Sequence, residues 1–289
     1  MKNVLFLLSD EHSQRFLGCT GANSENAITP NIDQLSAGGV RFTDAYCQMP
    51  LCTPSRISLL TGKQVRKSGA WTNESIIRPE LDTLPRSFAG AGYASCLVGK
   101  MHLGGTQQFA GFQFRPYGDL TGKCGHQWEP ITDLKRARSM RIRTELSGKT
   151  GIPESQLQDS IVTRETIAWI REHRAAQPDQ PFFLTAGFSR PHFPLTAPGR
   201  WVEYYKKRGI PRPFAPAAGD AFDHPMSTAM RKGFQAEAIS DEEMMSARIG
   251  YFANVSYLDE VIGDLLSTLN RDGALENTII IYTSDHGEL

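Results

Sequence analysis

Four short apolar runs restrict the folds open to this chain more than any other feature of its sequence. They cover Val4–Leu8, Tyr93–Val98, Pro181–Gly187 and Asn277–Thr283. None shows the apolar–polar alternation of a strand with one solvated face, and each has the length of a strand rather than a helix. Such runs are typical of strands that are buried on both faces of a parallel sheet. We therefore expect a parallel sheet that is covered on both sides.

Three helical patterns lie between these runs. Thr29 as the N-cap and Pro30 at the first helical position favour a helix over Asn31–Ala37. Apolar spacing predicts a second helix from about Asp159 to Arg174, and a third begins at Ser240, which forms a capping-box pattern with Glu243. Long helices that lead into buried strands indicate an α/β fold, with a doubly wound, mostly parallel sheet and helices on both faces. In such folds, sites form beyond the carboxyl ends of the strands.

The composition excludes several classes of protein. Of the 289 residues, 40% are hydrophobic, and 31 basic residues balance 31 acidic ones, so we expect a folded chain without a nucleic-acid partner. Five cysteines without a CxxC pair argue against a disulfide framework. No apolar run approaches the ~20 residues of a membrane span, and Val4–Leu8 is too short for a signal peptide. These features predict a cytoplasmic protein with no membrane partner.

Acidic residues follow the first and the last of the four runs. Asp10 and Glu11 come directly after one, and Asp285 and His286 come after the other. If these strands are neighbours, three carboxylates and an imidazole meet at one edge of the sheet. That donor set suits calcium, magnesium or manganese. Acids at strand ends also cap following helices, and this alternative stays open for each pair taken alone.

Cationic side chains follow the other two runs. Lys100 and His102 come after the second run, and Arg190 and His192 come after the third. A metal flanked by these groups suits a tetrahedral oxyanion such as sulfate or phosphate. A lone histidine near a strand end is often a structural residue instead. These cationic residues are expected at the same edge of the sheet as the acids, and this shared position favours an oxyanion-binding site.

The segment CTPSRISLLTG places Cys52 before a predicted helix and close to Arg56. A helix N-terminus and a nearby arginine lower the pKa of a thiol, so these residues predict a nucleophilic thiolate. The alternative is a buried structural cysteine.

This segment resembles the signature of the type I sulfatases, in which the cysteine is oxidised after translation to Cα-formylglycine. Further motifs agree with that family in order and spacing, and they are SDE, TPNIDQLSAGGVRFTDAYC, GKMHLG, SRPHFP and TSDHGE. The resemblance covers nearly the whole chain. It implies a fold of the alkaline-phosphatase superfamily and an enzyme that hydrolyses a sulfate monoester to an alcohol and sulfate.

The resemblance also implies a mechanism and a role for each matching residue. Formylglycine is hydrated to a gem-diol, one hydroxyl attacks the sulfur, the alcohol leaves, and collapse of the hemiacetal expels sulfate. Arg56 positions the diol, and Lys100, His102 and His192 contact the sulfate and supply the acid for the leaving group. The implied catalytic residues are therefore Cys52, Arg56, Lys100, His102 and His192. The implied ligands of one divalent cation are Asp10, Glu11, Cys52, Asp285 and His286.

The implied cofactor is calcium, with magnesium and manganese as alternatives, and the implied partner is a formylglycine-generating maturation enzyme. Two features depart from the family pattern. Asp10-Glu11 and Asp285-His286 replace the Asp-Asp and Asp-Asn pairs of many members, and they resemble the choline sulfatase and phosphonate monoester hydrolase branch. Family chains also continue beyond SDHGE. We therefore expect residues 1–289 to be the N-terminal part of a sulfatase catalytic domain, with the C-terminal subdomain absent.

Two alternatives to a sulfatase follow from these departures. One is a phosphonate monoester or phosphodiester hydrolase that uses the same site, although the phosphonate hydrolases do not keep the lysine and histidine of GKMHLG. The other is an inactive fragment that binds sulfate. An assay of both ester types separates these possibilities.

The expected substrate is a small-molecule or carbohydrate sulfate ester. Trp128 and Trp201 are candidates either for stacking on a sugar or caging a choline, or for the core. A basic cluster is a candidate for gripping a sulfated glycan or for a solvated face. It comprises Lys135, Arg136, Arg138, Arg141, Arg143 and Lys149.

Overall fold

The computed structural model describes residues 1–289 except 24, 106, 119–146, 214–224, 234–238 and 289. The chain divides into two compact units. The first comprises Met1–Pro130, Ile152–Pro191 and Leu258–Leu289, and the second comprises Ile131–Gly151 and His192–Tyr257. Trp128 and the basic cluster, apart from Lys149, lie outside the described residues.

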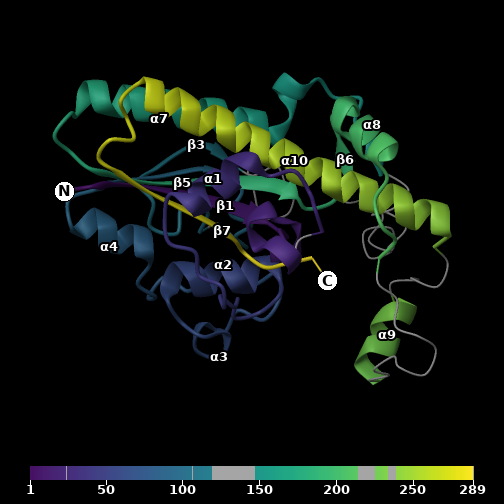
Figure 1. Ribbon diagram of the computed structural model, residues 1–289. Helices are drawn as coiled ribbons and strands as arrows, with labels where there is room; N and C mark the ends of the chain where they lie inside the picture. Colours follow the sequence, from purple (N-terminus) through teal and green to yellow (C-terminus); the bar gives the residue numbers. More distant parts are fainter. Residues whose placement is uncertain (24, 106, 119–146, 214–224, 234–238, 289) are drawn as a thin grey trace. The chain divides into compact units, whose positions relative to one another are not determined.

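The first unit contains a five-stranded sheet in the order β3-β2-β5-β1-β7, and each described pair of strands is parallel (Figure 1). Its strands are β1 (Asn3–Asp10), β2 (Ala94–Gly99), β3 (Phe114–Gly118), β5 (Phe182–Pro191) and β7 (Thr278–Ser284). The four predicted strands and the parallel sheet are confirmed. β1 and β7 are direct neighbours, as a shared site at their ends requires.

Helices cover both faces of this sheet. Figure 1 shows α2 and α4 on one face, and α7 with the C-terminal half of α10 on the other. The helices of the first unit are α1 (Pro30–Ala37), α2 (Cys52–Thr61), α3 (Val65–Ser68), α4 (Leu84–Gly90), α7 (Gln158–Ala176) and the end of α10 (Asp241–Arg271), with 3-10 turns at Gln14–Phe16, Gly18–Asn23 and Glu154–Gln156. All four predicted helices are present, and the one expected after Cys52 begins at Cys52 itself. Among the described helices, none has both the length and the apolar character needed to cross a bilayer.

Alternate residues of β1 form the core under α2. Val4, Phe6 and Leu8 are buried in one cluster with Ile57 and Leu60 of α2. This packing holds the start of α2 over the carboxyl end of β1.

β7 differs from the prediction of a strand buried on both faces. Its Ile279 and Ile281 are 46% and 41% exposed, and β1 is its one neighbour among the described strands. An unbroken isoleucine run does not reveal which strand lies at an edge of the sheet. Three apolar residues between α1 and α2 are also exposed: Val40, Phe42 and Tyr46.

The sequence predicts Thr29 as the N-cap of α1. In the structure, a residue from a distant helix caps α1 instead. The Thr29 hydroxyl makes no capping bond and donates to Asp33. Instead, the buried Asp259 of α10 accepts hydrogen bonds from the backbone N–H groups of Asn31 (3.2 Å) and Ile32 (2.8 Å). Its carboxylate thereby satisfies N–H groups that have no partner within the helix.

Replacing Asp259 by alanine is expected to reduce the free energy of unfolding by about 1 to 3 kcal/mol, because two buried N–H groups lose their acceptor. Urea unfolding followed by circular dichroism measures this change. The matched control is Asp264→Ala on the exposed side of the same helix, for which we expect a change within about 0.5 kcal/mol. Equal effects of the two substitutions would contradict the capping role.

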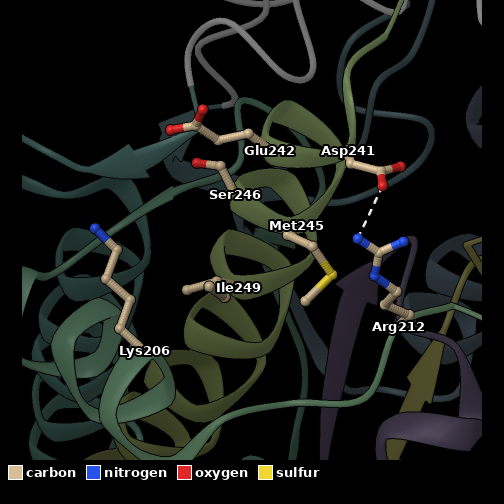
Figure 2. Close-up of a pocket in the computed structure, with 7 residues that line it drawn as sticks. All are labelled: Lys206, Arg212, Asp241, Glu242, Met245, Ser246 and Ile249. Carbon is tan, nitrogen blue, oxygen red and sulfur yellow. Dashed lines mark ion pairs between the residues drawn. The ribbon is translucent and has the colours of Figure 1, made fainter.

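The second unit is built from a two-stranded sheet and helices. Its elements are β4 (Gly148–Lys149), β6 (Thr196–Ala197), α8 (Gly199–Arg208), α9 (Pro225–Gly233) and the N-terminal half of α10. Trp201 stacks on the buried side chain of Tyr205. Trp201 therefore belongs to an aromatic cluster of this unit. Figure 2 shows a cleft between α8 and α10, with Lys206 on one side and the ion pair Arg212–Asp241 (2.8 Å) on the other. No residue predicted for the active site lines this cleft.

Candidate active site

The carboxyl ends of β1 and β7 bring two predicted acids together. The register pairs Ser9 with Ser284, and Asp10 and Asp285 follow these residues. Oδ1 of Asp285 accepts hydrogen bonds from the backbone N–H groups of Glu11 (3.1 Å) and His286 (2.8 Å). This carboxylate therefore ties the two strand ends to each other.

Cys52 lies at the first position of α2, directly against these acids. Its Sγ is 3.5 Å from Oδ1 of Asp10 and 3.4 Å from Nε2 of His286. The other ring nitrogen of His286 is 2.9 Å from the carbonyl oxygen of Gly287, so Nε2 is the nitrogen turned towards the sulfur. Ligand atoms of Asp10, Cys52, Asp285 and His286 all lie within 4.8 Å of one another. A carboxylate oxygen of Glu11 also lies within 4.8 Å of Sγ.

Arg56 follows Cys52 by one turn of α2 and joins three segments of the site. Its Nε donates to Oδ2 of Asp285 (2.9 Å), and its Nη1 donates to the carbonyl oxygen of Lys100 (2.9 Å). Its Nη2 is 3.5 Å from Oδ2 of Asp10, which also pairs with Nζ of Lys100. All four side chains are buried.

Both cations remain charged despite this burial. Burial alone would lower the pKa of Arg56 and of Lys100. For Arg56, the negative charges of Asp285 and Asp10 outweigh the effect of burial, so its pKa is raised. For Lys100, the negative charge of Asp10 outweighs the effect of burial, so its pKa is raised as well. The arrangement therefore fixes two positive charges beside the acids.

The donor set fits a hard divalent cation. Burial, followed by the charge of Asp10, raises the pKa of Asp285, so the site contains carboxylates that repel each other. Three carboxylates, from Asp10, Glu11 and Asp285, stand against the two cations and leave one net negative charge. Buried oxygen ligands with an excess of negative charge are what calcium, magnesium and manganese prefer.

The prediction of a thiolate at Cys52 is wrong. Burial and then the charge of Asp10 raise the pKa of its thiol, and the opposing effects of Lys100 and Arg56 are smaller in sum. The thiol is therefore protonated at neutral pH. The nearby arginine in the sequence does not reveal that acids from two other segments, Asp10 and Asp285, also lie beside the sulfur.

The sulfatase family model matches residues 2–289. The chain belongs to the sulfatase family. It is 26% identical over 297 residues to the choline-sulfatase of Rhizobium meliloti, and the match covers 99% of this chain and 57% of that protein.

Two solved structures share the fold of this sulfatase chain. One is the phosphonate monoester hydrolase of Agrobacterium radiobacter, with 22% identity and a TM-score of 0.73 over 99% of this chain and 63% of that one. The other is a protein in complex with its substrate D-glucosamine-2-N,6-O-disulfate, with 23% identity and a TM-score of 0.70 over 99% of this chain and 65% of that one. The predicted α/β fold with a mostly parallel sheet is confirmed. The sulfatase chain thus spans little more than half of its curated relative.

Sequence reasoning missed two residues that hold the start of α2 in this sulfatase chain. Oδ1 of Asn73 accepts the N–H of Thr53 (3.0 Å), and the Thr53 hydroxyl donates to the carbonyl oxygen of His102 (2.6 Å). Asn73 lies in a loop whose sequence shows no periodic pattern. Its role depends on a tertiary contact, and no local sequence pattern indicates that contact. These bonds fix the residue after Cys52 to the loop between α3 and α4 and to the loop that follows β2.

The two histidines expected beside the sulfate follow two different strands, β2 and β5. His102 is half-buried, with a left-handed backbone (φ 49°), and its carbonyl is tied to Thr53. Glu11 has a similar φ of 62°, and strained backbones of this kind cluster at functional sites. His192 is the first residue of the second unit and follows the end of β5 in sequence.

Proposed function

We propose that the protein containing this chain hydrolyses sulfate monoesters to an alcohol and sulfate, with formylglycine made from Cys52 as the nucleophile. The observation that carries this proposal is the position of Sγ of Cys52, 3.5 Å from Asp10 and 3.4 Å from His286 at the start of α2. Membership of the sulfatase family supports the class of reaction. The choline-sulfatase relative supports a sulfate ester as the substrate.

The environment of Cys52 supports its conversion to an aldehyde. A thiol whose pKa is raised by burial is a poor nucleophile. A hydrated aldehyde at Cβ of residue 52 carries two hydroxyl groups. One attacks the sulfur of the ester, and deprotonation of the other then releases the sulfate. Because Cys52 is 2% exposed in the folded chain, a maturation enzyme must act on this segment before it folds.

Asp10, Glu11, Asp285 and His286 would hold the divalent cation, calcium first and magnesium or manganese as alternatives. When bound, such a cation supplies a Lewis acid that polarises a sulfate oxygen and lowers the pKa of a hydroxyl group. Arg56 keeps the carboxylates of Asp10 and Asp285 in place through its two ion pairs. Lys100 holds a positive charge at the same edge, where the sulfate oxygens gain charge in the transition state.

The charge of the site favours a monoanionic ester. A divalent cation converts the net charge of the three carboxylates and two cations from one negative to one positive. That charge matches a sulfate monoester better than a phosphate monoester dianion. A phosphonate monoester is also a monoanion, and the fold likeness to a phosphonate monoester hydrolase favours it as the second candidate. The alcohol part of the ester can be a small molecule or a carbohydrate, for a sulfate ester and for a phosphonate ester alike.

Comparing two chromogenic esters tests this proposal. The protein is produced with a formylglycine-generating enzyme, loaded with calcium, and assayed with 4-nitrophenyl sulfate and with 4-nitrophenyl phenylphosphonate. We expect a higher kcat/KM for the sulfate. The reverse order would favour the phosphonate hydrolase. If neither ester is hydrolysed although mass spectrometry verifies formylglycine, the result would favour the remaining alternative, an inactive fragment that binds sulfate.

A further inference from the structure

A buried carboxylate outside the site binds the end of the strand that leads to His192. Asp159 lies in the first turn of α7 and is fully buried. Its Oδ1 accepts the backbone N–H (2.7 Å) and the hydroxyl (3.1 Å) of Ser189. Its Oδ2 accepts the backbone N–H of Arg190 (3.2 Å) and pairs with the Arg190 guanidinium (3.4 Å). Both carboxylate oxygens thus bind residues about thirty positions away in the chain.

The bonds coincide with an irregularity in the sheet. Leu8 of β1 pairs with Gly187 of β5, and the next pair is Asp10 with Pro191. β1 advances from residue 8 to 10 while β5 advances from 187 to 191, so β5 carries two extra residues in a bulge. Buried N–H groups in a bulge cannot all bond to the neighbouring strand and need another acceptor. Asp159 is that acceptor for Ser189 and Arg190.

The bulge determines how β5 meets the site. Before it, the N–H of Lys100 donates to the carbonyl oxygen of Gly187 (2.7 Å), which ties β5 to the loop after β2. After it, Pro191 lies in register with Asp10, and His192 is the next residue. A change in the bulge would therefore shift Pro191 along Asp10 and redirect the chain at His192.

We infer that Asp159 is a positioning residue that holds the bulge of β5 and so sets the orientation of the Pro191–His192 segment for leaving-group protonation. Asp159 does not touch the reacting atoms. The inference rests on the proposed function for its catalytic part, and on hydrogen bonds alone for its structural part. Two independent measurements therefore test it.

Hydrogen exchange at single amides tests the structural part without any activity. In Asp159→Asn, the one remaining oxygen can take the place of only one carboxylate oxygen, so one of the two backbone N–H groups, of Ser189 or of Arg190, loses its acceptor. We expect exchange at that amide to accelerate at least tenfold, with little change at the other. In Asp159→Ala, both amides should accelerate. Residues 183–187 of β5 should keep their protection in both variants. Equal loss of protection along the whole strand, or unchanged exchange at both Ser189 and Arg190, would overturn the inference.

Leaving-group dependence tests the catalytic part. Release of 4-nitrophenol needs little protonation, whereas release of an alkyl alcohol needs an acid. We expect Asp159→Asn to lower kcat for an alkyl sulfate at least tenfold and kcat for 4-nitrophenyl sulfate by less than threefold, with KM unchanged. Ser189→Ala, which removes one hydroxyl donor and keeps both backbone donors, is the matched control and should resemble the wild type. Equal losses on the two esters would overturn the inference. If the wild type cleaves neither ester, the proposed function fails, and the exchange measurement still decides whether Asp159 holds the bulge.

Discussion

Replacing Cys52 by alanine is expected to abolish sulfate ester hydrolysis, lowering kcat by at least about 10³-fold. Alanine lacks the Cβ–S bond whose oxidation turns Cβ into the aldehyde carbon, so the site loses its nucleophile while Asp10, Arg56 and His286 remain. Steady-state assays with 4-nitrophenyl sulfate measure the loss. Mass spectrometry of the tryptic peptide that contains residue 52 shows whether the wild type has lost its thiol.

Two further variants make this result specific. Cys52→Ser provides a hydroxyl without the second hydroxyl of a hydrated aldehyde, so it should retain sulfate on the serine and fail to turn over. Cys19→Ala, at a half-buried cysteine whose backbone N–H bonds to Asp33, should keep full activity. Full activity in a wild type that carries only the unmodified thiol would contradict the proposed nucleophile.

The fold was predictable where burial leaves a pattern in the sequence. Apolar runs marked β1, β2, β5 and β7, a proline marked the start of α1, and the Ser240–Glu243 capping box marked the start of α10. β3 was missed because its residues alternate in exposure around Arg115 and carry no apolar run. The edge position of β7 and the capping of α1 by Asp259 depend on which distant segments meet, and no local pattern encodes that.

The candidate site was predictable because its residues lie at the ends of parallel strands. Strand order alone was needed to bring Asp10 and Asp285 together. The protonation of Cys52 was predicted wrongly, since it depends on burial and on acids from other segments. Asn73 and Asp159 were missed for a similar reason, because each accepts hydrogen bonds from backbone groups distant in sequence: Asn73 at the start of α2, and Asp159 in the bulge of β5.

Removing calcium is expected to lower the melting temperature by about 5 to 10 °C. A ligand at 100 times its Kd stabilises the folded state by about 2.7 kcal/mol, and each kcal/mol moves the melting temperature of a domain of roughly this size by about 2–4 °C. The stabilisation arises because the cation relieves the repulsion among Asp10, Glu11 and Asp285. Thermal unfolding with calcium, with a chelator, and with magnesium or manganese in place of calcium measures it.

Glu11→Gln is the variant that assigns this response to the site. Asp285 is unsuitable, because its carboxylate also binds Arg56 and the N–H groups of Glu11 and His286, so its loss would destabilise the chain with or without a cation. Glutamine keeps the length of the Glu11 side chain and one carbonyl oxygen, and removes the charge. Since calcium affinity depends on the number of charged ligands, the rise in melting temperature should fall to less than half that of the wild type. Glu172→Gln, on the exposed face of α7, should leave the rise unchanged. A calcium response of the same size in Glu11→Gln and in the wild type would mean that the cation binds elsewhere on the chain.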